Sequence, residues 1–249
     1  DVSNCAGRLC LYYTFDDWHY AFRSSTYGHV FRQEGKIAMI EIINLSKTYG
    51  KSYVLRDINV TFDSGHIYGL VGENGCGKTT LMRCICGFTH PTTGQVKVLG
   101  NVIGKDADFA PSTGIIIENP GFLYHYNAKK NLALLAALSG NVSKERIDEV
   151  IRIVGLEPND KKHVGKYSLG MCQRLGIAQA IMEDPQILIL DEPFNGLDKQ
   201  GIADTHALLQ ALKAQGKTIL LACHSAADIE KACDIVYKME NGGLTMIKG

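Results

Sequence analysis

The sequence predicts an α/β fold built on a mostly parallel β-sheet with helices on both faces. From residue 40 onward, short runs rich in β-branched residues alternate with segments in which apolar residues recur at helical spacing. Several of these runs are apolar throughout, which is typical of strands buried on both faces of a sheet. Because ligands bind at the carboxyl ends of the strands in such sheets, the residues directly after each run are the first candidates for function.

The predicted elements follow one another along the chain. Strands are predicted at residues 40–45, 66–71, 95–99, 115–117, 187–190 and 218–222. Helices are predicted at residues 79–86, 131–138, 144–154, 170–181, 202–212 and 225–233. The helix at 144–154 has Ser143 as its expected N-cap and an apolar face that consists of Ile147, Val150, Ile151 and Val154.

The composition excludes several classes of protein. Of 249 residues, 45% are hydrophobic and 21% are charged, which rules out collagen-like and wholly disordered chains. The 26 Lys and Arg balance the 26 Asp and Glu, and a net charge of zero disfavours a general nucleic-acid binder, which binds by neutralising phosphates. The apolar stretches at 132–138 and 187–190 are far shorter than the roughly 18 residues of a transmembrane helix.

Residues 1–38 differ from the rest of the chain. They hold eight of its aromatic residues, show no helical or strand period and lack the features of a signal peptide. We therefore expect the functional domain to start at Met39, and residues 1–38 to be an extension that is mobile or not native to the protein. The eight cysteines are spread along the chain without a secretory signal, so we expect reduced thiols, as in the cytosol.

A phosphate-binding loop is predicted at residues 72–79. Their sequence, Gly-Glu-Asn-Gly-Cys-Gly-Lys-Thr, fits the pattern G-x-x-x-x-G-K-[ST] between a strand and a helix. Lys78 is its strongest element, because a charge pair near 4 Å is worth about 4 kcal/mol at an effective dielectric of 20, against about 0.3–1 kcal/mol for the helix N-terminus. The predicted nucleotide-binding residues are Gly72, Glu73, Asn74, Gly75, Cys76, Gly77, Lys78, Thr79 and Thr80.

Two adjacent carboxylates end the apolar strand at 187–190. Asp191 is expected to hold Mg²⁺ through water, as the partner of the Thr79 hydroxyl. Glu192, one residue further on, is expected to polarise the water that attacks the γ-phosphate. The loop and the acidic strand together predict a nucleoside-triphosphate hydrolase of the P-loop class.

With these motifs, residues 39–249 resemble the ATP-binding cassette (ABC) family. Residues 167–171, Tyr-Ser-Leu-Gly-Met, stand where the family has its Leu-Ser-Gly-Gly-Gln signature, and Gln173 and Arg174 continue it. Only the Ser and the second Gly match. The resemblance implies that Ser168, Leu169 and Gly170 act in trans on the ATP of a second subunit in a head-to-tail dimer.

Further positions match the family. Tyr49 stands where the family stacks an aromatic ring on adenine, although an ordinary strand-edge Tyr is the alternative. His224 follows the strand at 218–222, where the family has a histidine that touches the γ-phosphate. Four residues resemble the D-loop that contacts the opposite subunit, or else form a turn that caps the next helix: Asn195, Gly196, Leu197 and Asp198.

One departure from the family is informative. The family normally has Gln after the strand at 115–117, where this chain has Glu118. Glu at this place, with Ser-Leu-Gly-Met in the signature, resembles the bacitracin-resistance and lantibiotic-immunity branch of bacterial exporters. A carboxylate here could ligate the hydrated Mg²⁺, which makes Glu118 a third predicted metal residue beside Thr79 and Asp191.

The resemblance implies an architecture and a set of partners. It implies a P-loop (RecA-like) core at 39–118 and 168–249, an antiparallel β subdomain, and a helical subdomain at 119–167 that docks a membrane permease. The expected protein is a Mg²⁺-dependent ATPase, cytoplasmic and peripheral on the inner face of the cell membrane, that drives an exporter, with peptide antibiotics as a possible cargo, by dimer closure on ATP. Homodimer and heterodimer stay open, as does the transported substrate.

A soluble cassette protein acting on ribosomes or DNA is the rival interpretation. DNA-repair cassettes carry long coiled coils between the two nucleotide motifs, whereas only 113 positions separate Lys78 from Asp191 here, without sustained heptads. Ribosomal cassette proteins usually carry two cassettes and a basic linker. A degenerate nucleotide binder is a third interpretation, but it would lack Lys78, Asp191 or Glu192. We therefore expect no nucleic-acid partner.

Overall fold

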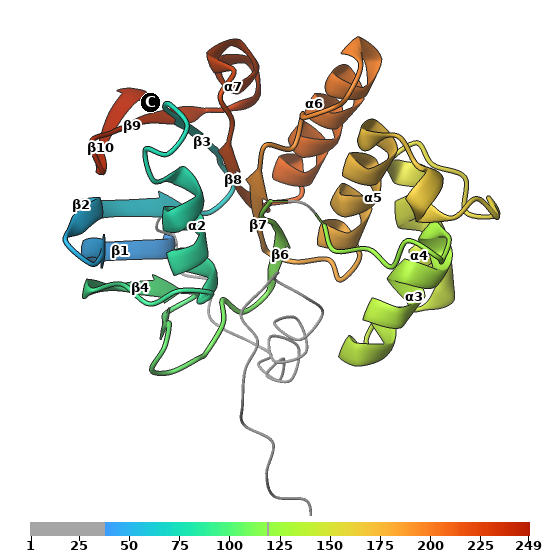
Figure 1. Cartoon of the computed structure of the whole chain (residues 1–249), viewed down its shortest axis with the longest axis horizontal. Helices are drawn as coiled ribbons and strands as arrows, with labels where there is room; N and C mark the ends of the chain where they lie inside the picture. The colour runs from blue at the N-terminus through green and yellow to red at the C-terminus, as the bar shows by residue number, and fades with distance from the viewer. Residues whose placement is uncertain (1–37, 119) are drawn as a thin grey trace, which may run out of the picture.

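Two β-sheets form the frame of the protein. The computed structural model describes residues 38–118 and 120–249 (Figure 1), so the extension predicted at 1–38 lies almost wholly outside the described residues. The larger sheet has the order β10-β9-β3-β8-β7-β6, and all its strands are parallel except β10. The smaller sheet, β2-β1-β4-β5, is antiparallel. The predicted α/β fold with a mostly parallel sheet is confirmed.

The elements have the following bounds. The strands are β1 Ala38–Tyr49, β2 Ser52–Asp63, β3 Ile67–Val71, β4 Thr93–Val98, β5 Asn101–Val102, β6 Thr113–Ile116, β7 Ile187–Asp191, β8 Thr218–Ala222, β9 Ile235–Glu240 and β10 Gly243–Lys248. The helices are α2 Lys78–Cys86, α3 Ala128–Ser139, α4 Lys144–Ile153, α5 Leu169–Ile181, α6 Lys199–Ala214 and α7 Ala226–Ala232, with a short 3₁₀ helix at Val164–Lys166.

Strand β2 is an element that the periodicity did not predict. Its buried residues Leu55, Ile58 and Phe62 are three and four positions apart, a spacing that favours a helix over a strand. The spacing arises because the pairing of β2 with β1 contains several register shifts, and each shift moves the buried side of the strand by one residue. Strands β9 and β10, at the end of the chain, were not predicted either.

The parallel sheet separates two hydrophobic clusters, which explains the continuous apolar runs. Leu188 and Leu190 of β7 face the cluster formed with the helices α3 to α7, whereas Ile187 and Ile189 face the cluster formed with α2 and the antiparallel sheet. All five residues of β7 are buried. The helices α3, α4 and α5 lie together on one side of the molecule, at the right of Figure 1. None of the helices that the structure describes is long and apolar enough to cross a bilayer.

The strand order brings the predicted motifs to one edge of the sheet. In the register of the parallel strands, Leu70 of β3 pairs with Ala222 of β8, and Ala222 pairs with Asp191 of β7. Leu190 of β7 pairs with Ile116 of β6. Four segments therefore leave the sheet side by side at its carboxyl edge: the phosphate loop after β3, residues 223–224 after β8, Glu192 after β7 and residues 117–118 after β6.

Candidate nucleotide-binding and catalytic site

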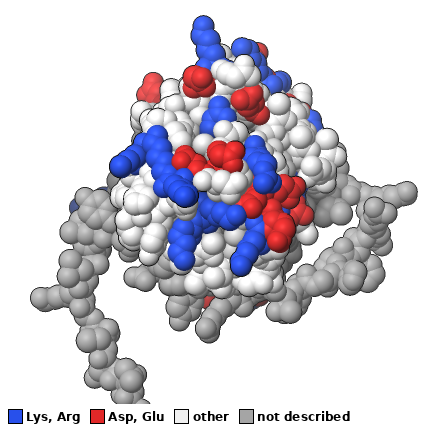
Figure 2. Space-filling view, turned by 90° about the vertical axis from the view of Figure 1, so that its right-hand side faces the viewer, with Lys and Arg blue, Asp and Glu red and all other residues white. Residues whose placement is uncertain are grey.

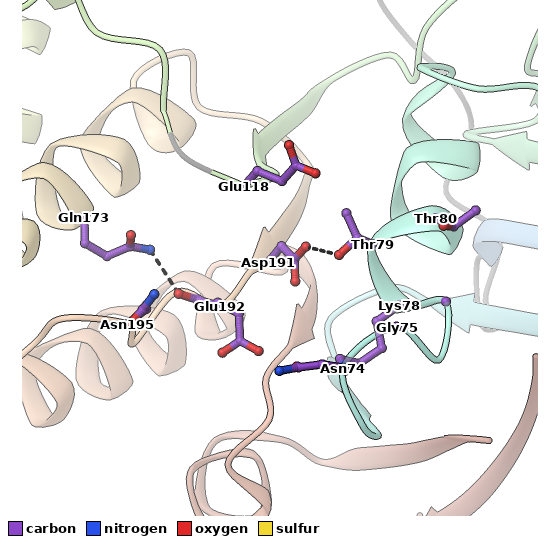
Figure 3. Close-up of a pocket in the computed structure, with 11 residues that line it drawn as sticks. Asn74, Gly75, Lys78, Thr79, Thr80, Glu118, Gln173, Asp191, Glu192 and Asn195 are labelled. Carbon is purple, nitrogen blue, oxygen red and sulfur yellow. Dashed lines mark hydrogen bonds between the residues drawn. The ribbon is translucent and has the colours of Figure 1, made fainter. Parts of the chain in front are cut away.

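A pocket at this edge collects much of the predicted site (Figure 3). It is lined by Asn74, Gly75, Gly77, Lys78, Thr79, Thr80, Glu118, Gln173, Asp191, Glu192 and Asn195. The predicted residues outside this lining are Tyr49, Gly72, Glu73, Cys76, Ser168, Leu169, Gly170, Gly196, Leu197, Asp198 and His224. The phosphate loop, the acidic strand and Glu118 therefore meet in one pocket, while the signature and Tyr49 lie outside it.

The phosphate loop is held in shape by its own residues. The Lys78 side chain is buried, and its ammonium donates hydrogen bonds to the carbonyl oxygens of Gly72 at 2.7 Å and Glu73 at 3.0 Å. Gly77 has a φ of 113°, and a Cβ on it would lie 2.9 Å from the Leu55 side chain, so both the backbone and the available space require glycine. A loop of this form at a helix N-terminus is a binding site for phosphate.

Thr79 and Asp191 join this helix to the acidic strand. The Thr79 hydroxyl donates to Oδ2 of Asp191 at 2.6 Å, which is one of the dashed lines in Figure 3. Burial raises the pKa of Asp191, and the nearby carboxylates of Glu192 and Glu118 add to this effect, although the Thr79 hydroxyl opposes it. A buried carboxylate with two others nearby favours a cation, and oxygen ligands suit Mg²⁺. These residues fit a magnesium site.

Glu192 is held at the end of β7 by three contacts. Its backbone N–H donates to the Ala222 carbonyl at 2.8 Å, and its carbonyl accepts from Nε2 of Gln173 at 3.2 Å. Its Oε2 lies 2.9 Å from Nδ1 of His224. Glu192 has a φ of 50°, and a left-handed backbone costs a residue with a Cβ about 1–2 kcal/mol, a strain often found at functional sites. The carboxylate is therefore fixed at the pocket, with an imidazole beside it.

The signature segment is a helix N-terminus at the surface. Ser168 is the N-cap of α5, where its hydroxyl accepts a hydrogen bond from the Met171 N–H at 3.2 Å. The side chain of Leu169 is 54% exposed. A Cβ on Gly170 would lie 2.7 Å from the Gly196 carbonyl oxygen, so the signature packs closely against the predicted D-loop. Its predicted action in trans stays a prediction.

One residue of the predicted D-loop lines the pocket, whereas Tyr49 lies outside it. Asn195 lines the pocket, and Asp198 caps α6 by accepting a hydrogen bond from the Gly201 N–H at 2.9 Å. The segment therefore does cap the next helix, which leaves its predicted contact with a second subunit open. Tyr49 is 52% exposed at the end of β1, with the Lys47 ammonium 5.0 Å from its ring centre, and its stacking on adenine stays a prediction.

Two residues near the site were not predicted as part of it. Gln173 is buried on α5 and holds the Glu192 carbonyl; its signal in the sequence is an amide among the mostly apolar residues of that helix. Arg83 of α2 forms an ion pair with Glu118 at 2.6 Å. No local pattern links these two residues, which are 35 positions apart. The six cysteines in the described part of the chain are free thiols in the structure.

Fold and site together define a P-loop nucleoside-triphosphate hydrolase, and comparison with known proteins gives the family. Residues 55–195 match the ABC transporter family. An uncharacterized ABC transporter ATP-binding protein of Bacillus subtilis is 45% identical over 83% of this chain and 94% of its own length. The bacitracin transport ATP-binding protein of Enterococcus faecalis is 42% identical over 83% of this chain and 68% of its own length. A solved ATP-binding subunit of an ABC transporter is 28% identical, with a TM-score of 0.76 over 84% of this chain and 90% of that one.

The chain belongs to the ABC transporter family. It is the ATP-binding subunit of such a transporter and an ATPase, with ATP and Mg²⁺ as its ligands. ABC ATP-binding subunits dimerise and pair with membrane permeases. These relatives are transport proteins, and nothing in the comparisons supports the rival interpretation of a cassette acting on ribosomes or DNA.

Proposed function

We propose that this chain powers the export of a peptide antibiotic through a separate permease, at the cytoplasmic face of the membrane. The observation that carries the proposal is Glu118, a carboxylate in the nucleotide pocket where the family normally has Gln. The same feature pointed to the bacitracin-resistance branch, and the likeness to a bacitracin transport ATP-binding protein agrees with it.

In this proposal the pocket binds and positions ATP. Residues 72–80 bind the phosphates, and Tyr49 stacks on the adenine ring. Thr79, Asp191 and Glu118 would hold Mg²⁺, which offsets the charge of the phosphates when it is bound. Lys78 turns its ammonium from the loop carbonyls toward a phosphate oxygen, because a charged acceptor makes the stronger hydrogen bond.

In the same proposal, Glu192 at the end of β7 and the residues that contact it carry out hydrolysis. Glu192 accepts a proton from the attacking water at its carboxylate, and Gln173 keeps the Glu192 backbone in place. His224, 2.9 Å from that carboxylate, contacts the γ-phosphate and orients Glu192. The signature, residues 168–170, and the D-loop, residues 195–198, reach the ATP of a second subunit, which is supported by the exposure of Leu169.

The helical subdomain, residues 119–167, is proposed to dock the permease. It contains eight Lys and Arg against five Asp and Glu, and Figure 2 shows Lys and Arg side chains gathered on the side of the molecule where this subdomain lies. Tyr124 is 69% exposed. A locally positive surface with an exposed aromatic ring suits a membrane-bound partner, whose surroundings are anionic on the cytoplasmic side.

Resistance to bacitracin tests this proposal directly. The chain is expressed in a sensitive bacterium together with a permease that copurifies with it, and the inhibitory concentration is measured. We expect it to rise with the unaltered chain and to stay at the baseline with Glu192→Gln at equal expression, because transport needs hydrolysis. Equal sensitivity with both chains, although the permease copurifies with the unaltered one, would contradict the proposed cargo.

A further inference from the structure

Glu118 has a cationic partner on the helix that carries the phosphate loop. Nη2 of Arg83 lies 2.6 Å from Oε1 of Glu118, a short charge-assisted hydrogen bond. The Arg83 side chain is 19% exposed and that of Glu118 is 54% exposed. The guanidinium is therefore largely enclosed, while the carboxylate lies at the mouth of the pocket that it lines.

The placement of this pair follows from the geometry of α2. Arg83 comes four residues after Thr79, so both side chains lie on the same face of the helix. Thr79 binds Asp191 at the end of β7, and Arg83 binds Glu118 just after β6. Because β6 and β7 are neighbouring parallel strands, one face of α2 is linked to two adjacent strand ends, and each link includes a predicted metal residue.

The pair also changes the charge balance of the pocket. Glu118, Asp191 and Glu192 are three carboxylates in one lining, and the charge of Glu118 is felt at Asp191, whose pKa it helps to raise after burial, the larger cause. Lys78 donates to the carbonyls of its own loop. The Arg83 guanidinium is thus the cation in direct contact with the carboxylate that replaces the neutral Gln of the family.

We propose that Arg83 is the positioning residue for Glu118 and competes with Mg²⁺ for its carboxylate. The guanidinium orients Glu118 at the edge of the pocket and offsets its charge, so the metal that arrives with the nucleotide must share this carboxylate with Arg83. The inference rests on the proposed role of Glu118 beside Mg²⁺. A left-handed backbone at Glu118, with a φ of 61°, keeps its side chain at this turn between β6 and the helical subdomain.

Binding of Mn²⁺ at a fixed concentration of ADP tests the proposal without turnover. The free Mn²⁺ is followed by electron paramagnetic resonance in titrations of the full chain and its variants. Arg83→Gln frees the Glu118 carboxylate, so we expect Mn²⁺ to bind about twofold to fivefold more tightly, the range set by a partly exposed charge pair. Arg83→Lys keeps the positive charge and is expected to bind Mn²⁺ like the unaltered chain.

A double-mutant cycle with Glu118→Gln decides whether Arg83 acts through Glu118. We expect Glu118→Gln alone to weaken Mn²⁺ binding, and Arg83→Gln to have no further effect in that background. The same tightening in both backgrounds, or no tightening in either, overturns the inference while leaving the role of Glu118 intact. Unchanged Mn²⁺ binding in Glu118→Gln removes Glu118 from the metal and overturns both. Thermal unfolding of each variant verifies that it is folded.

Discussion

Residues at two helix N-termini of this chain are predicted to contact ATP. One N-terminus lies in a pocket that the chain itself forms, and the other lies outside this pocket. At α2, Lys78 and Thr79 lie in a pocket, and Thr79 is hydrogen-bonded to a strand on the opposite side of that pocket. At α5, Ser168 caps its own helix and Leu169 is exposed, outside the pocket lining. The first site is assembled by the sheet within one chain, whereas the second is an exposed helix N-terminus whose predicted ligand is the ATP of a second subunit.

The two sites are nevertheless connected through the end of β7. Gln173, one turn into α5, holds the backbone carbonyl of Glu192. Gly170 packs against Gly196, four residues after Glu192. A change at the surface site can therefore reach the carboxylate in the pocket through short, direct contacts. The difference between the two helices suggests which substitutions act within a subunit and which act across a dimer.

Glu192→Gln is expected to have the largest effect. Loss of the carboxylate removes the general base, and the turnover number should fall about 10²-fold to 10⁴-fold. The amide has the same shape, so ATP binding should persist. ATP hydrolysis and nucleotide-dependent dimer formation, measured by phosphate release and by light scattering, check both statements. Unaltered turnover would remove Glu192 from its role as base.

Lys78→Ala is expected to act at an earlier step, by weakening ATP binding. The lost charge contact is worth about 4 kcal/mol at an effective dielectric of 20, so the stabilisation by ATP should disappear. In the unaltered chain that stabilisation amounts to about 2.7 kcal/mol at a ligand concentration of 100 times the dissociation constant. Ser168→Ala is the matched control, since it lies outside the pocket and should keep nearly all of the stabilisation of the monomer.

Glu192 and Lys78 belong to the part of the site that the sequence could predict. Strands such as β7 are apolar throughout because the sheet is buried on both faces, and the motifs at their ends are contiguous in the chain. The Arg83–Glu118 pair could not be predicted, since it depends on the order of the strands in the sheet, which places the end of β6 near α2. Gln173 was noted only as part of the signature, because its contact with Glu192 depends on how α5 packs.

Mixing variant subunits tests whether the two helix N-termini act within one subunit or across a dimer. Lys78→Ala should inactivate the site of its own subunit, and Ser168→Ala the site of its partner, so each variant alone is expected to be nearly inactive. A mixed dimer of the two has one site with both changes and one intact site. We expect ATPase activity to recover in part on mixing. Mixtures as inactive as the separate variants would show that the two residues act within one subunit.

The smallest expected effects are on folding stability. The carboxylates of Asp191 and Asp234 are expected to change it in opposite directions. The pKa of Asp191 is raised, first by burial. Burial also favours a raised pKa at Asp234. The hydrogen bonds that it accepts from the Ile67 N–H at 2.9 Å and the Lys213 ammonium at 2.6 Å outweigh burial, so the pKa of Asp234 is lowered. Ionised Asp191 therefore destabilises the folded state, whereas ionised Asp234 stabilises it.

Melting temperatures as a function of pH would separate the two. A raised pKa means that the folded state binds more protons, so the stability due to Asp191 falls as the pH rises from the unfolded value toward the folded one. Asp191→Asn should thus be more stable than the unaltered chain at neutral pH, with the difference vanishing in acid. The stability due to Asp234 is present above the unfolded value and is lost as the pH falls toward its lowered pKa, so Asp234→Asn should be less stable at neutral pH. If Asp191→Asn also proves destabilising at neutral pH without nucleotide, the carboxylate is a structural support like Asp234, and the pocket is not held ready for a cation.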